Sequence, residues 1–148
     1  MKIIIKRGDP VKDGRILFEL DNQIFVRRFD LPPRDVAEQV NYLKNSIVYL
    51  VYDIDKIIGF FAYEVKNKTE AEVKTMALLP EYQSKGIGQT MMKRVLLLLK
   101  KYKLKLATHP KNTQAIIFYL KSGFEIYGWK ENYFGDGEPR LLLKRTKN

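Results

Sequence analysis

The chain contains no cysteine and a single histidine among its 148 residues. The absence of cysteine excludes a disulfide framework, a thiolate metal site and a thiol nucleophile. Any nucleophile must therefore come from a substrate or from an oxygen atom. We expect a cytoplasmic protein, because nothing in this composition requires an oxidising compartment.

Long apolar runs are also missing. Residues 3–5 are closed by Lys6 and Arg7, and residues 95–99 have two basic residues on either side. Neither run is long enough for a signal sequence or a membrane span, so no membrane partner is expected. With 45% hydrophobic residues the chain can still bury a core, and its length predicts one domain over residues 1–148.

The net charge of +10 lies entirely in the second part of the chain. Residues 1–84 carry 13 basic and 13 acidic side chains, whereas residues 85–148 carry 14 basic and 4 acidic ones. A positive field there would attract a polyanionic ligand. A solvated, lysine-rich surface explains the same charge equally well. Binding of nucleic acid is the weaker alternative, because no recognised motif for it accompanies the charge.

Hydrophobic periodicity predicts seven strands and four helices. Runs rich in β-branched and aromatic residues, or with alternating apolar residues, indicate strands at residues 2–6, 47–52, 57–65, 69–79, 103–108, 124–129 and 141–144. Helices are expected over residues 11–25, 33–43 and 88–102, and between Asn112 as N-cap and Gly123 as the residue after the C-cap.

Two of these helices have a clear predicted inner face. For the helix over residues 88–102 it comprises Met91, Met92, Val95, Leu98, Leu99 and Tyr102. For the helix after Asn112 it comprises Ala115, Ile116, Tyr119 and Leu120. The methionines belong to a core rather than to a cofactor site in this interpretation.

The turn between Leu79 and Gly88 joins a strand to a helix and contains two glycines. Such a turn lets several backbone N–H groups point at one spot, where the helix adds its positive dipole end. It predicts an anion site that needs no basic side chain. A dinucleotide fingerprint does not fit, because Met91 stands where the third glycine would be, and a Gly-Lys-Ser/Thr P-loop is absent.

The turn belongs to a longer pattern, Gln83-x-x-Gly86-x-Gly88, followed by Asn112-x-x-Ala115-x-x-Phe118-Tyr119-x-x-x-Gly123-Phe124. In these motifs the chain resembles the GNAT family of N-acetyltransferases, over most of residues 47–145. The resemblance implies an α/β domain with a mixed, mostly antiparallel seven-strand sheet flanked by about four helices. The sheet would be split between its fourth and fifth strands to hold acetyl-CoA, and no metal is implied.

The resemblance also implies how the coenzyme binds. Its diphosphate would lie on the backbone amides of Gln83, Ser84, Lys85, Gly86, Ile87, Gly88 and Gln89. Its pantetheine arm would pair with the fourth strand at Met76, Ala77 and Leu78, and would contact Asn112 and Tyr119.

Three catalytic roles follow from the same resemblance. An amine attacks a thioester only when neutral, so a base is needed, and Glu72 stands where several members carry a catalytic glutamate. The alternative for Glu72 is a surface carboxylate paired with Lys74. Tyr119 matches the family's general acid for the leaving thiolate, and it can pack against the sheet at the same time. The Met76 amide would stabilise the oxyanion.

Residues 130–138 are similar to the tail hairpin of ribosomal-protein and peptide N-terminal acetyltransferases. There an aromatic pair, here Tyr133 and Phe134, lines the slot for the substrate. One departure is Ala107, which stands where the bacterial ribosomal-protein enzymes have a glutamate. His109 precedes a proline at a strand end, and we expect a solvated loop residue rather than a base.

We therefore predict direct transfer of an acetyl group from acetyl-CoA to a primary amine. The acceptor stays open between a protein N-terminus, a lysine and a small amine. Asp30, Asp35 and Glu38 would favour a cationic small molecule, although they also fit ordinary helix-surface charges. The alternative is a non-catalytic module that senses or holds acyl-CoA. Nucleic acid is not an expected partner, and a homodimer is left open.

Overall fold

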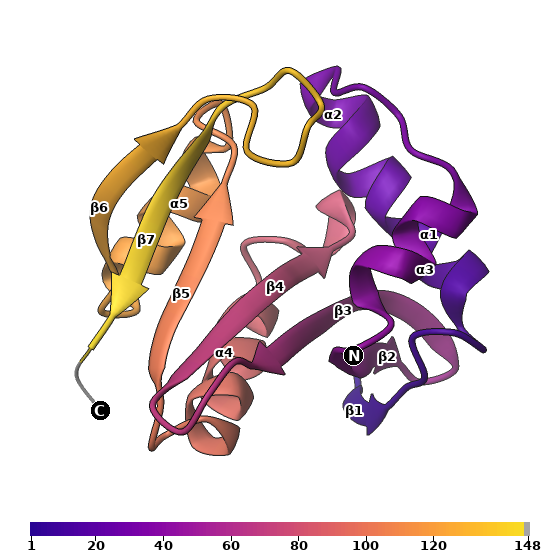
Figure 1. Cartoon of the computed structure of the whole chain (residues 1–148). Coiled ribbons are helices and arrows are strands. Elements are labelled where there is room, and N and C mark those ends of the chain that lie inside the picture. Colours follow the sequence, from indigo (N-terminus) through magenta and orange to yellow (C-terminus); the bar gives the residue numbers. More distant parts are fainter. Residues whose placement is uncertain (147–148) are drawn as a thin grey trace.

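The computed structural model describes residues 1–146 and contains one seven-stranded sheet (Figure 1). The strands are β1 (Ile3–Arg7), β2 (Ile47–Asp53), β3 (Lys56–Val65), β4 (Glu70–Leu78), β5 (Lys103–Thr108), β6 (Glu125–Lys130) and β7 (Arg140–Arg145). Their order in the sheet is β1-β2-β3-β4-β5-β7-β6. Only β4 and β5 run parallel, and all other neighbours are antiparallel. The predicted mixed sheet is confirmed.

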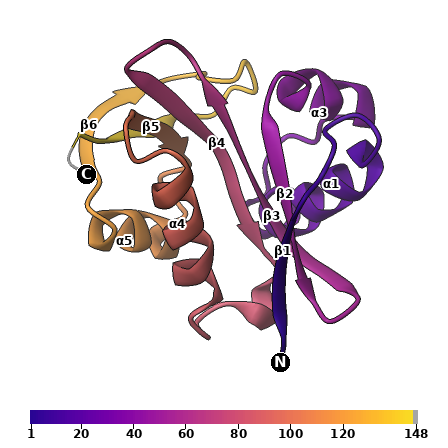
Figure 2. The same ribbon diagram turned by 90° about the horizontal axis from the view of Figure 1, so that it is seen from below.

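Helices cover both faces of this sheet. The N-terminal ones are α1 (Gly14–Asp21), the π-helix η1 (Asn22–Val26), α2 (Arg27–Phe29) and α3 (Val36–Leu43). The later ones are the 3₁₀ turn η2 (Pro80–Tyr82), α4 (Ile87–Leu98) and α5 (Thr113–Lys121). Figure 2 shows α1 and α3 on one face and α4 and α5 on the other. No helix of the described part is long and apolar enough to cross a membrane.

Several helix boundaries differ from the prediction. The helix expected to start at Pro33 starts at Val36, because the Asp35 carboxylate accepts the Glu38 N–H and the Glu38 carboxylate accepts the Asp35 N–H. This reciprocal capping box fixes the start of α3. The segment expected to be one α-helix from residue 11 begins at Gly14 and passes through the π-helix into α2.

Two predicted inner-face residues are wrong. Leu98 is exposed because α4 ends there, and the core is reached instead by Leu99 in the following turn. Leu120 is exposed because the inner face of α5 is set by Ala115 and Tyr119, four residues apart, which places Phe118 on that face. The other side chains predicted for these two faces are buried or half-buried.

The parallel strands separate after a short stretch of pairing. β4 and β5 pair only from Glu70–Lys103 to Glu72–Lys105, although β4 continues to Leu78 and β5 to Thr108. Figures 1 and 2 show the two strands diverging beyond that point. The edge of β4 that faces β5 is therefore open over its last six residues. The predicted split between the fourth and fifth strands is confirmed.

A β-bulge sits on β4 beside this split. Ala62 pairs with Thr75 and Tyr63 with Val73, so Lys74 has no partner in β3. Bulges bend a strand and redirect its side chains. Nearby, Gly59 on β3 allows β4 to approach closely, because a Cβ there would lie 2.3 Å from the Ala77 carbonyl oxygen.

Candidate active site

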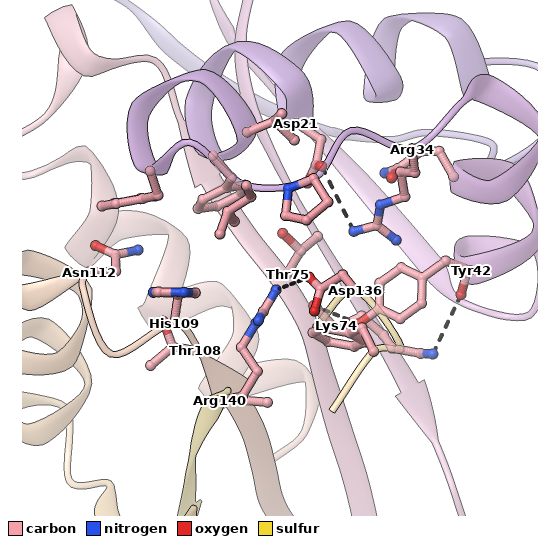
Figure 3. A pocket seen from close by; sticks show the side chains of 18 of the residues that line it. Asp21, Arg34, Tyr42, Lys74, Thr75, Thr108, His109, Asn112, Asp136 and Arg140 are labelled. Carbon is pink, nitrogen blue, oxygen red and sulfur yellow. Dashed lines mark hydrogen bonds and ion pairs between the residues drawn. The ribbon is translucent and has the colours of Figure 1, made fainter. Parts of the chain in front are cut away.

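A cavity of about 520 Å³ lies at the open end of the split (Figure 3). The N-terminal helices and the loop that follows them form one wall, with Asp21 and Arg34. The ends of β4 and β5 and the start of α5 form the opposite wall, with His109 and Asn112. The β6–β7 loop completes it, and there Phe134 contacts Tyr42 of α3 edge to face, with ring centroids 5.5 Å apart.

The bulge brings three successive residues of β4 to the cavity, namely Lys74, Thr75 and Met76. A regular strand would present only alternate residues to one side. Of the three residues expected beside a pantetheine arm, Met76 lines the cavity. Ala77 is buried, and the Leu78 carbonyl accepts a hydrogen bond from Gln83 Nε2 at 2.9 Å.

The turn from Gln83 to Gln89 lies outside the cavity, beyond the end of β4. Within the described residues, none of the six backbone N–H groups of residues 84–89 donates a hydrogen bond to the protein. Gly86 caps α4 with a φ of 85°, and a Cβ there would meet nothing within 4 Å. These amides are available to an anion, in the way helix N-termini generally bind phosphate.

Arg28 of α2 reaches this turn across the split. Its Nη1 donates to Gln83 Oε1 and its Nη2 to Gln114 Oε1, each at 3.1 Å. Gln114 belongs to the first turn of α5. One guanidinium thus connects the N-terminal helices to the elements on both sides of the split, and sequence periodicity gave no signal for it.

Asn112 and Tyr119 approach the cavity from α5. The Asn112 carboxamide oxygen accepts the Ala115 N–H at 3.2 Å, which confirms the predicted N-cap. Tyr119 is buried and its ring contacts Phe124 and Phe118, while its hydroxyl forms no hydrogen bond to the described residues. Burial raises the pKa of Tyr119 well above its ordinary value. The hydroxyl therefore stays protonated at neutral pH and can act as a proton donor.

Glu72 does not line this cavity. Its carboxylate lies 3.5 Å from Lys66 Nζ and 3.8 Å from Lys74 Nζ. It lines a separate hollow of about 120 Å³, together with Tyr133. Of the aromatic pair expected to line one slot, Phe134 lies in the cavity and Tyr133 in the smaller hollow. The structure thus places Glu72 apart from Met76 and Tyr119.

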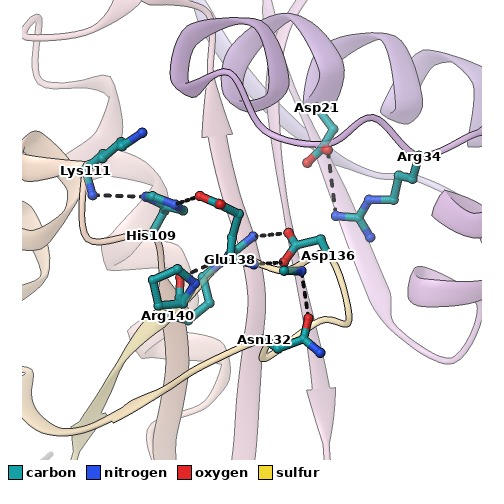
Figure 4. Close-up of polar contacts among 10 residues, drawn as sticks. Asp21, Arg34, His109, Lys111, Asn132, Asp136, Glu138 and Arg140 are labelled. Carbon is teal, nitrogen blue, oxygen red and sulfur yellow. Dashed lines mark hydrogen bonds and ion pairs between the residues drawn. The ribbon is translucent and has the colours of Figure 1, made fainter.

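His109 is buried at 6% exposure, so the expectation of a solvated loop residue is wrong. Its Nδ1 accepts the Lys111 N–H at 3.0 Å, which leaves Nε2 as the protonated nitrogen, donating to the Glu138 carboxylate at 2.8 Å (Figure 4). Both ring nitrogens are engaged. His109 positions the β6–β7 loop and has no free nitrogen to serve as a base.

The sequence prediction missed a buried carboxylate in the N-terminal wall. Asp21 is 8% exposed, and Arg34 Nη2 lies 3.9 Å from its Oδ2. Burial raises the pKa of Asp21, and the charge of Arg34 offsets only part of that increase. Of the three acidic residues expected near the acceptor, Glu38 lines the cavity, while Asp35 caps α3 and Asp30 is exposed.

The β6–β7 loop carries its own ion pair. Asp136 accepts hydrogen bonds from Arg140 Nη2 at 2.8 Å and from the Glu138 N–H at 2.9 Å. Burial opposes ionisation here, but these two donors hold the pKa of Asp136 below its ordinary value. Within the described residues no group of three His, Cys, Asp or Glu side chains could hold a metal ion.

An open strand edge, a turn of unpartnered amides and a buried tyrosine at one split define the class of acyl-CoA-dependent acyltransferases. Residues 44–126 match the family described as "Acetyltransferase (GNAT) domain", and the chain belongs to this family. The protein is accordingly an acetyl-CoA-dependent N-acetyltransferase. Of the two alternatives predicted from the sequence, the enzyme is therefore favoured over the non-catalytic module.

Two curated relatives are similar in sequence. The uncharacterized N-acetyltransferase YjcF of Bacillus subtilis is 24% identical over 144 residues, which are 97% of each chain. N-alpha-acetyltransferase 50 of Danio rerio is 33% identical over 101 residues, which cover 64% of this chain and 60% of the relative.

Solved structures share the whole fold. A GNAT family acetyltransferase from Elizabethkingia anophelis with acetyl-CoA bound is 25% identical, with 97% of each chain covered and a TM-score of 0.77. Naa50 of Arabidopsis thaliana, in complex with the bisubstrate analogue CoA-Ac-MVNAL, is 21% identical, with 98% of this chain and 99% of that chain covered and a TM-score of 0.80.

Proposed function

We propose that this enzyme transfers the acetyl group of acetyl-CoA directly to the amine of a peptide N-terminus. The observation that carries the proposal is that Met76, Asn112 and Tyr119 meet in one cavity at the open end of the sheet. The similarity to N-alpha-acetyltransferase 50, and to Naa50 solved with a peptide-bearing analogue, supports a peptide acceptor. A small amine is the second candidate, because the cavity also holds a buried carboxylate, Asp21.

The coenzyme would bind across the split. The free N–H groups of residues 84–89, at the start of α4, suit its diphosphate. The unpaired edge of β4 offers the backbone groups of Met76 and the N–H of Leu78 to the amide-bearing pantetheine arm, whereas the Leu78 carbonyl already accepts from Gln83. Asn112 at the start of α5 would contact the same arm, which leads the thioester into the cavity.

The transfer needs three protein groups. The neutral amine attacks the thioester carbon, and the Met76 N–H would donate to the oxyanion that forms, a contact commonly worth about 3 kcal/mol of barrier. Collapse of the intermediate breaks the carbon–sulfur bond, and Tyr119 would give its proton to the thiolate. The nitrogen of the intermediate, which carries one proton more than the amide, would return a proton to Tyr119. The acceptor ammonium first loses a proton to a base. Glu72 lies outside the cavity, so in this role it would act through water.

Two measurements test the proposal. Saturating acetyl-CoA at a hundred times its Kd should stabilise the protein by about 2.7 kcal/mol, read as a higher Tm. Release of free thiol, followed with a panel of short peptides and their N-terminally blocked counterparts, should require the free α-amine. Binding of acetyl-CoA without thiol release on any amine would contradict the proposal and favour a sensing module.

A further inference from the structure

Asp21 differs from the other carboxylates that line the cavity. Asp136 accepts hydrogen bonds from Arg140 and Glu138, and Glu38 accepts the Asp35 N–H. Asp21 accepts no hydrogen bond from any described residue, and the Arg34 guanidinium stays 3.9 Å away. Figure 3 shows Asp21 on the N-terminal helices, across from Asn112 and His109. A buried carboxylate normally has several donors, so this one lacks partners.

A second buried polar group lines the same wall. Gln39 of α3 is 2% exposed, and its side-chain oxygen has no hydrogen-bond partner within the described part of the chain, but this oxygen is also shut off from solvent. α1 and α3 pack directly against each other. A ligand in the cavity can therefore reach the Asp21 carboxylate but not the Gln39 oxygen, and Asp21 is the acceptor that a ligand N–H group would meet on this wall.

Apolar residues also line the cavity, namely Phe25, Val26, Leu31, Pro32 and Pro33. The π-helix begins directly after Asp21, and such irregular turns often occur at functional sites. Apolar walls with a charge at the end suit a methylene chain that carries a cationic head.

Arg34 does not occupy this place. Its side chain is 30% exposed, and its guanidinium lies over the Tyr42 ring, 5.0 Å from the centroid. The charge of Arg34 is therefore partly solvated, and most lone pairs of Asp21 remain free. The remaining cations of the cavity are engaged elsewhere, Arg140 with Asp136 and Lys74 with Glu64 and Glu72.

We propose that Asp21 binds the cationic end of an alkylammonium arm of the acceptor, so that the enzyme selects acceptors with this second charge. Such an arm is the side chain of a lysine that carries the reacting α-amine, or one end of a diamine whose other end reacts. The inference rests on the proposed function for the reacting amine. A carboxylate stabilises an ammonium as a cation, so the amine held at Asp21 is not the one acetylated.

Matched acceptors test the inference. One pair is a short peptide beginning with lysine and the same peptide beginning with norleucine, which keeps the methylene stem and removes the charge. The other is 1,5-diaminopentane and n-pentylamine. We expect kcat/KM to be at least about tenfold higher for the charged member of a pair, the usual scale of one charged hydrogen bond. The two pairs distinguish a peptide from a diamine as the source of the arm.

Asp21→Asn should reduce this preference to about one. Glu19→Gln removes an exposed charge from the same helix and should retain the preference. An equal kcat/KM within both pairs, or an unchanged preference in Asp21→Asn, would overturn the inference. Circular dichroism and Tm establish that each variant is folded.

A binding measurement separates this inference from the proposed function. With CoA present, 1,5-diaminopentane should raise the Tm of the wild-type protein and of Glu19→Gln, but not that of Asp21→Asn. This readout does not need turnover. Absence of acetyl transfer together with this shift would reject only the proposed function. Transfer to amines without any shift or charge preference would reject only the cation site.

Discussion

His109 Nε2 donates to a Glu138 carboxylate oxygen at 2.8 Å, which fastens the β6–β7 loop to the end of β5 (Figure 4). The same loop is held internally, because the Asn132 side chain accepts the Gly137 N–H at 2.7 Å. Phe134 and Asp136 of this loop line the cavity. The loop therefore faces the cavity as a wall that these hydrogen bonds hold in place.

Glu138→Ala should loosen this wall. We expect the free energy of unfolding to fall by about 1 kcal/mol, because the Glu138 carboxylate is a charged acceptor that is partly exposed. KM for the acceptor should rise several-fold, while the Kd for CoA stays unchanged. Isothermal titration and steady-state kinetics measure both constants. Glu125→Ala, at an exposed position of β6, is the control, and an equal effect of the two variants would contradict the role of Glu138.

Alanine substitutions at three glycines distinguish the cost of a steric clash from the cost of an unfavourable backbone conformation. Gly59→Ala should cost at least about 2 kcal/mol of stability, because its Cβ would lie 2.3 Å from the Ala77 carbonyl oxygen. Gly86 and Gly135 have positive φ values of 85° and 78°, and a Cβ at either position would meet nothing within 4 Å. Gly86→Ala and Gly135→Ala should therefore each cost about 1 kcal/mol of stability, through the backbone conformation alone. Only Gly86→Ala should also weaken CoA binding, measured by titration. An equal Kd for both would argue against the turn as the diphosphate site.

The parts of the site that were predictable depend on short stretches of sequence. Gly86 and Gly88 follow a strand and begin a helix, and both features are local. Asn112 lies three residues before the N–H group that it caps. The split was predicted only through the family resemblance. Local patterns and family motifs thus predicted the turn, the N-cap and the split to which we assign the coenzyme.

The wall to which we assign the acceptor was not predictable in this way. Asp21, Arg34 and Gln39 come from three separate elements, and only tertiary packing brings them to one wall. Sequence spacing likewise gave no sign that Glu138, 29 residues away, would form a hydrogen bond with His109. The pairing of Glu72 with Lys74 was predicted as an alternative. The ion pair of Glu72 with Lys66 was not predicted, because Lys66 lies on the other side of the β3–β4 turn.

Tyr119→Phe tests the proton donor. The ring should keep its contacts with Phe118 and Phe124, so Tm and the Kd for CoA should hardly change. We expect kcat to fall by about 10²-fold, the lower range for loss of general acid catalysis. Because burial raises the pKa of Tyr119, the wild-type kcat should show no alkaline decline from this group below pH 10. Tyr127→Phe, at an exposed position, is the control, and equal kcat values would reject the role.

Glu72→Gln tests the base with a closely matched control. Glu64 and Glu72 both pair with Lys66 and Lys74, so Glu64→Gln disturbs the same cations. If Glu72 takes the proton through water, kcat should fall at least about tenfold in Glu72→Gln only. Stopped-time assays at pH 7 and pH 9 measure it, and the loss should shrink at the higher pH, where more acceptor is neutral. Similar kcat values in both variants would assign Glu72 a structural role.

Asp21→Asn should stabilise the protein at neutral pH. Burial raises the pKa of Asp21 above its ordinary value of 3.8, so the folded state binds this proton more tightly than the unfolded state. Its contribution to stability is greatest below pH 3.8 and is lost as the pH rises through the folded pKa. Asparagine has no charge to bury, and the neighbouring Arg34 is partly solvated.

Urea unfolding of both proteins between pH 3.5 and pH 7.5 gives the difference in stability directly. The gain of Asp21→Asn should be small at the acid end, increase with pH, and level off above the folded pKa. Glu19→Gln, whose carboxylate is exposed, should show no such trend. A variant less stable than wild type at pH 7 would mean that Arg34 stabilises the Asp21 carboxylate by more than burial destabilises it. Asp21 would then be a paired structural charge, without the free capacity that a cationic acceptor requires.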